Sequence, residues 1–107
     1  MNEDRALMAL CLARKAGKLC CGTELCIEAA RGKKALLILT ANDVSPQTLK
    51  RIADKSNHNG VPVEQTAYSR ERLGAAFGFP ECACVALCDR NFVNMYSQAK
   101  NKQSEVN

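Results

Sequence analysis

TELCIEAARGKKALLILTANDVSP, residues 23–46, decides the fold of this 107-residue chain. Its first part carries apolar residues at helical spacing and ends at Gly32, which indicates a helix over 23–31. ALLILT, residues 35–40, is a continuous apolar run that is too short for a helix and indicates a buried strand. Ser45-Pro46 places an N-cap serine before a proline at the first helical position, and therefore predicts another helix. This succession of elements is typical of an α/β protein.

The rest of the chain continues the alternation. EDRALMALCLARKAG predicts a helix that stops at Gly17, Leu19–Cys21 is a candidate for a very short strand, and Thr23 is the predicted N-cap of the next helix. Further elements are expected downstream: strands at 61–67 and 82–88, a short helix between Ser69 and Gly78, and a last helix capped by Asp89. We predict a three-layer α/β/α sandwich with a small mixed sheet, as one domain over 1–100 with a polar tail over 101–107.

Length and composition limit the class of protein. A chain of this length buries roughly two thirds of its unfolded surface, and 47% of its residues are apolar, which suffices for a core without disulfides or metal. No apolar run approaches the roughly 20 residues that span a bilayer. The start, MNEDRALMAL, is acidic and does not resemble a secretory signal. We therefore predict a cytoplasmic protein with no membrane partner, and the sequence gives no reason to predict a dimer.

The seven cysteines do not form a metal-binding pattern. Their number is odd, no C-x-x-C pair occurs, and His58 is the single histidine. Cys82, Cys84 and Cys88 lie at even spacing, so they are predicted to share one face of a buried strand, where reduced cysteine behaves as a small apolar residue. No metal and no cofactor are predicted.

GKLCCGT, residues 17–23, allows several kinds of chemistry. It has the glycine spacing of a phosphate loop, but Thr23 and a glutamate follow where that loop needs lysine and a hydroxyl residue. Cys20 and Cys21 lie just before a helix start and near Lys18, two features that lower the pKa of a thiol, so thiol chemistry stays open as an alternative. No base or second carboxylate is placed for catalysis, and the chain is predicted not to be an enzyme.

Positive charge is concentrated near the start of the helix over 23–31. The window from Arg14 to Lys34 holds six basic residues against two glutamates, and this excess equals the +4 net charge of the chain. Backbone N–H groups of Gly22, Thr23 and Glu24 at a helix start favour an anion. The strand over 35–40 runs back and should bring Asn42 and Asp43 to the same end. We predict one surface there, with phosphate contacts from Arg14, Lys15 and Lys18.

The order of GTELCIEAARGKKALLILTANDVSP, NGVPV, LGAAFG and CACVAL resembles the kink-turn-binding ribosomal-protein superfamily, in its short bacterial branch. The similarity covers roughly residues 5–98. It implies an α/β/α sandwich that binds structured RNA, in ribosomal RNA or at the ribosome. The implied RNA-binding positions, matched to this sequence, are Lys18, Gly22, Thr23, Glu24, Asn42, Asp43, Phe79, Glu81 and Cys82.

The sequence departs from the family at three positions that contact base edges. Where kink-turn binders carry Asn, Glu and Lys, this chain carries Glu24, Leu25 and Glu28, which removes a donor, removes an acceptor and reverses a charge. Base contacts supply specificity and phosphate contacts supply position. We expect an RNA-binding protein in which Glu24 and Asn42 reach the bases. The alternatives are a protein-interaction module with degenerate RNA readout and a thiol-based redox or ligand-binding protein.

Overall fold

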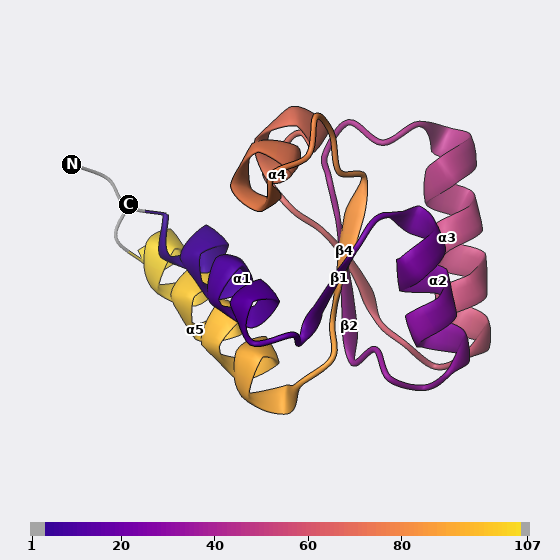
Figure 1. Ribbon diagram of the computed structural model, residues 1–107, viewed down its shortest axis with the longest axis horizontal. Helices are drawn as coiled ribbons and strands as arrows, with labels where there is room; N and C mark the ends of the chain where they lie inside the picture. The colour runs from indigo at the N-terminus through magenta and orange to yellow at the C-terminus, as the bar shows by residue number, and fades with distance from the viewer. Residues whose placement is uncertain (1–3, 106–107) are drawn as a thin grey trace.

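A computed structural model gives the structure of residues 4–105, and of their side chains as far as residue 102. Helices and strands alternate along these residues, as the sequence predicts (Figure 1). The elements are α1 (Arg5–Lys15), β1 (Leu19–Cys21), α2 (Thr23–Arg31), β2 (Leu37–Thr40), α3 (Pro46–His58), β3 (Val63–Gln65), α4 (Arg70–Phe77), β4 (Cys84–Leu87) and α5 (Arg90–Glu105).

The four strands form one mixed sheet in the order β1-β4-β2-β3. β4 is antiparallel to both of its neighbours, with Leu87 opposite Leu19 of β1 and opposite Leu37 of β2, whereas β2 and β3 are parallel. β2 and β4 occupy the centre and every residue in them is buried. Their continuous apolar runs are explained by this position, because a central strand covered on both faces has no polar side.

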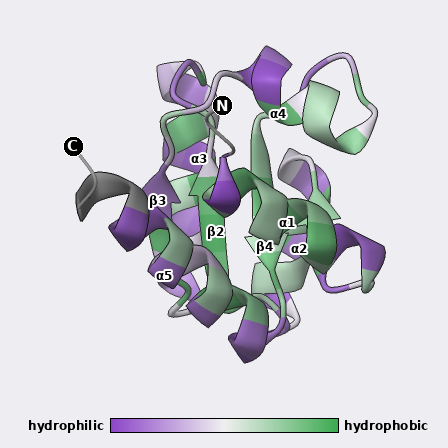
Figure 2. Ribbon diagram, turned by 90° about the vertical axis from the view of Figure 1, so that its left-hand side faces the viewer, coloured by the Kyte–Doolittle hydropathy of each residue, from purple (hydrophilic) through white to green (hydrophobic). Residues whose placement is uncertain are grey.

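Helices cover both faces of the sheet, and this confirms the predicted sandwich. In Figure 1, α2 and α3 lie on one side of the strands and α1, α4 and α5 on the other. The core accordingly divides into two clusters, one around Leu10, Leu39 and Leu87, the other around Ile38 and Ile52. Figure 2 shows the green, apolar strands β2 and β4 enclosed by helices that carry purple, hydrophilic residues.

Several helix ends follow from local sequence. The Ser45 hydroxyl accepts a hydrogen bond from the Thr48 amide at 3.3 Å, and Pro46 is the first helical residue of α3. The Ser69 hydroxyl caps α4 in the same way, and Gly78 ends that helix in the left-handed conformation, at φ 84°. These ends are confirmed, because side-chain caps and left-handed glycines act within a few residues.

Three details differ from the predictions. The N-cap of α2 is Gly22, at φ 101°, and Thr23 is the first helical residue. Cys82 packs in the cluster beside α1 and α4, whereas Cys84 packs beneath α2, because Cys82 precedes β4 and does not follow the alternation of that strand. The predicted tail, 101–107, begins inside α5, which continues to Glu105; residues 106–107 lie outside the described residues. Within residues 4–105, no helix is both long and apolar enough to cross a membrane.

Candidate nucleic-acid interface

Three loops meet at one end of the sheet. β1 and β2 both end there and β4 begins there, because β4 runs antiparallel to the other two strands. The Gly22 amide donates to the Cys84 carbonyl at 2.9 Å, and the Ala41 amide donates to the Ala83 carbonyl at 2.8 Å. We call this surface the loop end; it comprises Gly22–Glu24, Asn42-Asp43 and Phe79–Cys82. The prediction that the first two segments lie together is confirmed.

The first turn of α2 is open at the loop end. Gly22 has no side chain to cap the helix, and its own amide is used in the sheet, so it is not one of the free donors that the sequence suggested. The amides of Thr23 and Glu24 belong to the first turn, where an α-helix offers no internal acceptor. Together with the positive end of the helix dipole, they form a surface that favours an anion.

Glu24 is held by an arginine from another helix. Arg51 of α3 donates to both carboxylate oxygens of Glu24, with 3.0 Å between Nη2 and Oε1. This contact lowers the pKa of the Glu24 carboxyl below its ordinary value. Both side chains are largely exposed, so the pair fixes their positions more than it stabilises the fold. The sequence did not indicate Arg51, because no spacing pattern connects a residue on α3 with one on α2.

Asn42 and Asp43 are mainly occupied with protein contacts. The Asn42 side-chain amide donates to the Ala67 carbonyl at 3.0 Å, so one of its two N–H donors is used within the protein. Asp43 accepts from the Arg70 amide at 2.8 Å and lies 3.4 Å from Arg70 Nε. Arg70 Nη1 also lies 3.4 Å from a Glu81 carboxylate oxygen. Two predicted site residues, Asp43 and Glu81, are therefore joined by an arginine that the sequence did not single out.

The segment from Phe79 to Cys82 forms the outer wall of the loop end. It packs closely on Gly74, where an added Cβ would lie 2.6 Å from the Phe79 carbonyl oxygen. Phe79 remains 41% exposed. Cys82 is buried and presents no side chain to a ligand, because it fills the cluster that contains Phe77.

Among the predicted phosphate contacts, Arg14 reaches the loop end. Its guanidinium lies over the Phe79 ring, 4.9 Å from the ring centre, and donates to the Cys21 sulfur at 3.1 Å. A long side chain thus carries charge from the C-terminal turn of α1 to the wall formed by Phe79. Cation and ring together make a surface on which a base or a phosphate can be held.

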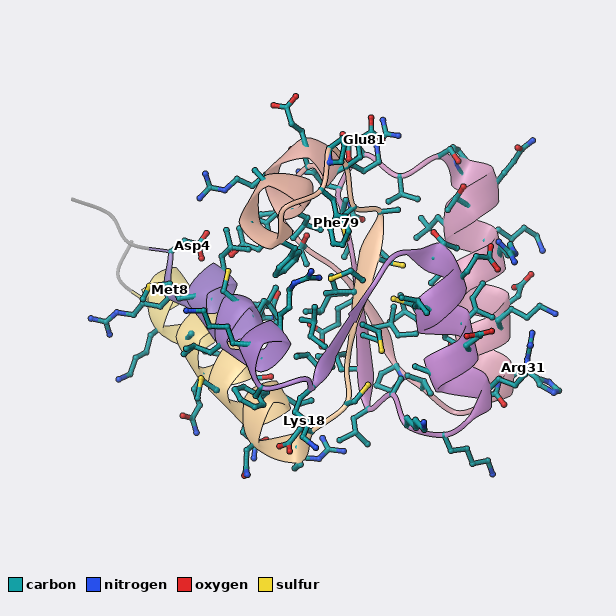
Figure 3. The ribbon with its side chains drawn as sticks, in the orientation of Figure 1. Asp4, Met8, Lys18, Arg31, Phe79 and Glu81 are labelled. Atoms are coloured by element: carbon teal, nitrogen blue, oxygen red, sulfur yellow. The ribbon has the colours of Figure 1, made fainter. Side chains whose placement is uncertain are left out.

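Lys18 is not brought to the loop end. Lys15 is the last residue of α1, and the Lys18 carbonyl accepts from the Cys88 amide at 2.9 Å, at the opposite end of the sheet. Figure 3 shows Lys18 far from Phe79 and Glu81. Lys33, Lys34 and Arg90 follow α2 and β4 at that same end, and we call Lys18, Lys33, Lys34 and Arg90 the lysine end.

No cluster suited to a metal ion lies in the described part of the chain: residues 4–105 contain no group of three or more His, Cys, Asp or Glu side chains arranged as ligands. The loop end offers instead backbone donors, three guanidinium groups and one exposed aromatic ring. Such groups hold phosphates and bases.

Proteins of similar sequence are known in bacteria. The chain is 36% identical to a protein named RNA-binding protein YlxQ from Bacillus subtilis (strain 168) over 83 residues, which are 78% of this chain and 82% of the relative. It is 43% identical to a protein of the same name from Enterococcus faecium over 61 residues, or 57% of this chain. That second match spans 59% of the relative, less than two thirds of its length.

Solved structures share the fold. A protein of unknown function from Bacillus halodurans has a TM-score of 0.81 at 27% sequence identity, with 91% of this chain and 97% of that chain covered. The 15.5kD RNA binding protein of Giardia lamblia has a TM-score of 0.74 at 18% identity, over 95% of this chain and 89% of that chain. A family model described as "Ribosomal protein L7Ae/L30e/S12e/Gadd45 family" matches residues 4–95. The chain belongs to the ribosomal protein L7Ae/L30e/S12e/Gadd45 family.

Proposed function

We propose that this chain is a cytoplasmic, non-enzymatic RNA-binding protein that binds structured RNA, in ribosomal RNA or at the ribosome, through the loop end. The single observation that carries the proposal is the convergence of the open first turn of α2, the Arg14–Phe79 pair and the Asn42-Asp43 loop on one end of the sheet. Family membership and the names of the two bacterial relatives support the same function. The domain extends over residues 1–100, which include the family match.

Phosphate groups are bound by backbone and arginine. The amides of Thr23 and Glu24 face an anion at the start of α2, and Arg14 and Arg51 flank that position through their contacts with Cys21 and Glu24. In this arrangement Glu24 orients Arg51 and does not itself contact a base. The three family positions at Glu24, Leu25 and Glu28 thus contribute little base recognition.

Unstacked bases are bound by the wall of the loop end. Phe79 is exposed on a segment fixed against Gly74, and Arg14 lies over its ring. Single-stranded loops and bulges present bases that stack on aromatic side chains, whereas a plain duplex keeps its bases stacked internally. The protein should therefore prefer RNA with an unstacked base, such as a kink-turn, over a duplex of equal length.

The experiment is a salt series of binding to a kink-turn RNA and to a plain duplex. Both affinities should fall as salt rises, because bound cations release counterions from the phosphates. The kink-turn should bind about tenfold more tightly, the value of one base stacked on an aromatic ring. Phe79→Ala should remove this preference and leave duplex binding in place. Met95→Ala is the matched control, since Met95 is also 41% exposed but lies on α5.

Two results would contradict the proposal. A kink-turn preference that Phe79→Ala leaves intact would show that the bases are bound elsewhere. Absence of binding to either RNA at low salt would support the alternative, a protein-interaction module that keeps the fold without RNA readout.

A further inference from the structure

Two thiols meet behind the wall of the loop end. Cys21 ends β1 and packs against the core cluster that contains Cys82, where the two thiols are close enough to influence each other's titration. The Cys82 thiol itself donates to the Cys84 carbonyl at 3.2 Å. Cys21 and Cys82 come from segments 61 positions apart in the sequence, the start of α2 and the loop before β4. Cys21 is partly exposed and Cys82 is buried. One thiol is thus accessible to a small molecule, and its neighbour is sheltered.

A fixed cation lies beside the accessible thiol. Arg14 Nη1 is 3.1 Å from the Cys21 sulfur. The guanidinium is held in place by two aromatic rings, whose centres lie 4.9 Å away for Phe79 and 6.0 Å away for Phe77. The neighbouring Cys82 thiol, together with the hydrogen bond and charge of Arg14, outweighs partial burial and lowers the pKa of Cys21 to about 7. A substantial fraction of Cys21 is therefore thiolate at neutral pH.

None of the other cysteines combines an accessible thiol, a lowered pKa and an adjacent arginine. Cys26 and Cys84 are both buried, so neither thiol is accessible, although Cys26 lowers the pKa of the Cys84 thiol. Cys84 and burial raise the pKa of the Cys26 thiol. Burial and the neighbouring Cys20 raise the pKa of Cys88 to about 11. Cys11 donates to a backbone carbonyl of α4 at 3.8 Å. Oxidation should therefore be selective for one pair.

We propose that Cys21 and Cys82 form a peroxide-sensitive dithiol that closes into an intramolecular disulfide between the start of α2 and the loop before β4. The Cys21 thiolate attacks one oxygen of hydrogen peroxide, the O–O bond breaks, and Cys21 sulfenic acid and hydroxide form. The Cys82 sulfur then attacks the Cys21 sulfur: the S–S bond forms, the S–O bond breaks, and the leaving oxygen takes the Cys82 proton and departs as water. Two electrons pass from the two sulfurs to peroxide.

This inference does not depend on RNA binding. The chemistry involves Cys21, Cys82 and Arg14 alone, and its product is recognised by mass. Arg14 nevertheless contacts both Cys21 and Phe79, so the disulfide would form beside the loop end.

The experiment treats the reduced full-length chain with hydrogen peroxide near pH 7.5 and blocks the remaining thiols with N-ethylmaleimide. Trypsin then releases residues 19–31 and 73–90, each of which holds three cysteines. The expected product is one disulfide between these two peptides that dithiothreitol reverses. Because each peptide holds three cysteines, variants identify the linked pair.

The two thiols have different expected roles, so their variants should behave differently. Cys21→Ser should abolish both the disulfide and any sulfenic acid. Cys82→Ala, which keeps the core apolar, should abolish the disulfide and leave a sulfenic acid at Cys21 that dimedone traps. Cys20→Ser and Cys88→Ser are the matched controls on the neighbouring pair and should form the disulfide normally. Arg14→Gln should slow the oxidation about fivefold near neutral pH, because the thiolate fraction falls.

Three results would overturn the proposal. They are a disulfide that survives Cys21→Ser, a disulfide between two chains in place of the internal one, and a folded protein in which peroxide leaves Cys21 unmodified. Circular dichroism of each variant establishes that it is folded before oxidation is measured, and the dimedone adduct of Cys82→Ala reports Cys21 reactivity without the disulfide.

Discussion

The loop end and the lysine end of the sheet carry charge in two different ways. At the loop end Arg51 pairs with Glu24, Arg70 lies between Asp43 and Glu81, and each side chain has a defined position. At the lysine end Lys18, Lys33, Lys34 and Arg90 take part in none of the ion pairs formed among residues 4–102.

The surface with the largest net positive charge need not be the surface that recognises RNA. The lysine end holds most of the excess positive charge, which attracts a polyanion over a distance of about 10 Å at 0.1 M salt. The loop end is nearly neutral, but its donors and its aromatic ring are fixed. Lysines that attract phosphates without holding them at fixed positions do not distinguish one RNA from another. We therefore propose that the loop end, whose side chains have fixed positions, recognises RNA.

The largest expected effect compares glycines at the two ends. Gly74→Ala would place a Cβ 2.6 Å from the Phe79 carbonyl oxygen and 2.8 Å from the Glu81 backbone, and none of these atoms moves easily. We expect the free energy of unfolding to fall by about 3 kcal/mol, as measured by urea denaturation. Gly32→Ala, near the lysine end, meets one atom at 3.4 Å and should change it by less than about 0.5 kcal/mol. Equal midpoints for the two variants would mean that the Phe79 segment repacks without cost.

The next effect compares thiols at the two ends. Cys21, beside Cys82 and Arg14, has a pKa of about 7, whereas burial raises the pKa of Cys88 to about 11 despite the charges of Lys18 and Lys34. The thiolate is the reactive form, so alkylation of Cys21 should rise with pH and reach half its maximum near pH 7. At pH 7.5 iodoacetamide should modify Cys21 about thirtyfold faster than Cys88, after allowance for the lower nucleophilicity of the more acidic thiol. Mass spectrometry over time measures both rates, and equal rates would contradict the assignment of the pKa values.

A smaller effect compares cations at the two ends. Arg14→Gln removes one positioned phosphate contact and should lower RNA affinity about fivefold to tenfold near 0.1 M salt, with a shallower salt dependence. Lys18→Gln removes the same charge from the lysine end and should lower affinity about twofold. Fluorescence anisotropy with one RNA at several salt concentrations gives both values. A larger loss of RNA affinity for Lys18→Gln than for Arg14→Gln would show that RNA binds at the lysine end.

The smallest effect concerns an acid at the loop end. Glu24→Gln removes a negative charge beside the first turn of α2 and frees Arg51, so affinity for a plain RNA duplex should rise about threefold. Glu28→Gln, one turn further along the same helix, is the matched control and should have little effect. A loss of affinity in Glu24→Gln would show that the carboxylate contacts RNA, as the sequence analysis expected.

Much of the fold was predictable because its signals are local. The apolar runs of β2 and β4, the serine caps of α3 and α4 and the left-handed Gly78 each depend on a few neighbouring residues. Near the ends of a short strand, the face of the sheet on which a side chain packs was less predictable. Cys82 lies outside β4, so strand alternation could not place it.

The sequence by itself determined the order of elements, the buried centre of the sheet and the family. Tertiary structure decided which side chains share a surface. It placed Lys18 at the end of the sheet opposite Phe79, paired Glu24 with Arg51, and brought Arg14, Cys21 and Cys82 together. The physical reason is that periodicity and capping act over one or two turns, whereas these contacts join segments that become neighbours only when the strands pair and the helices pack.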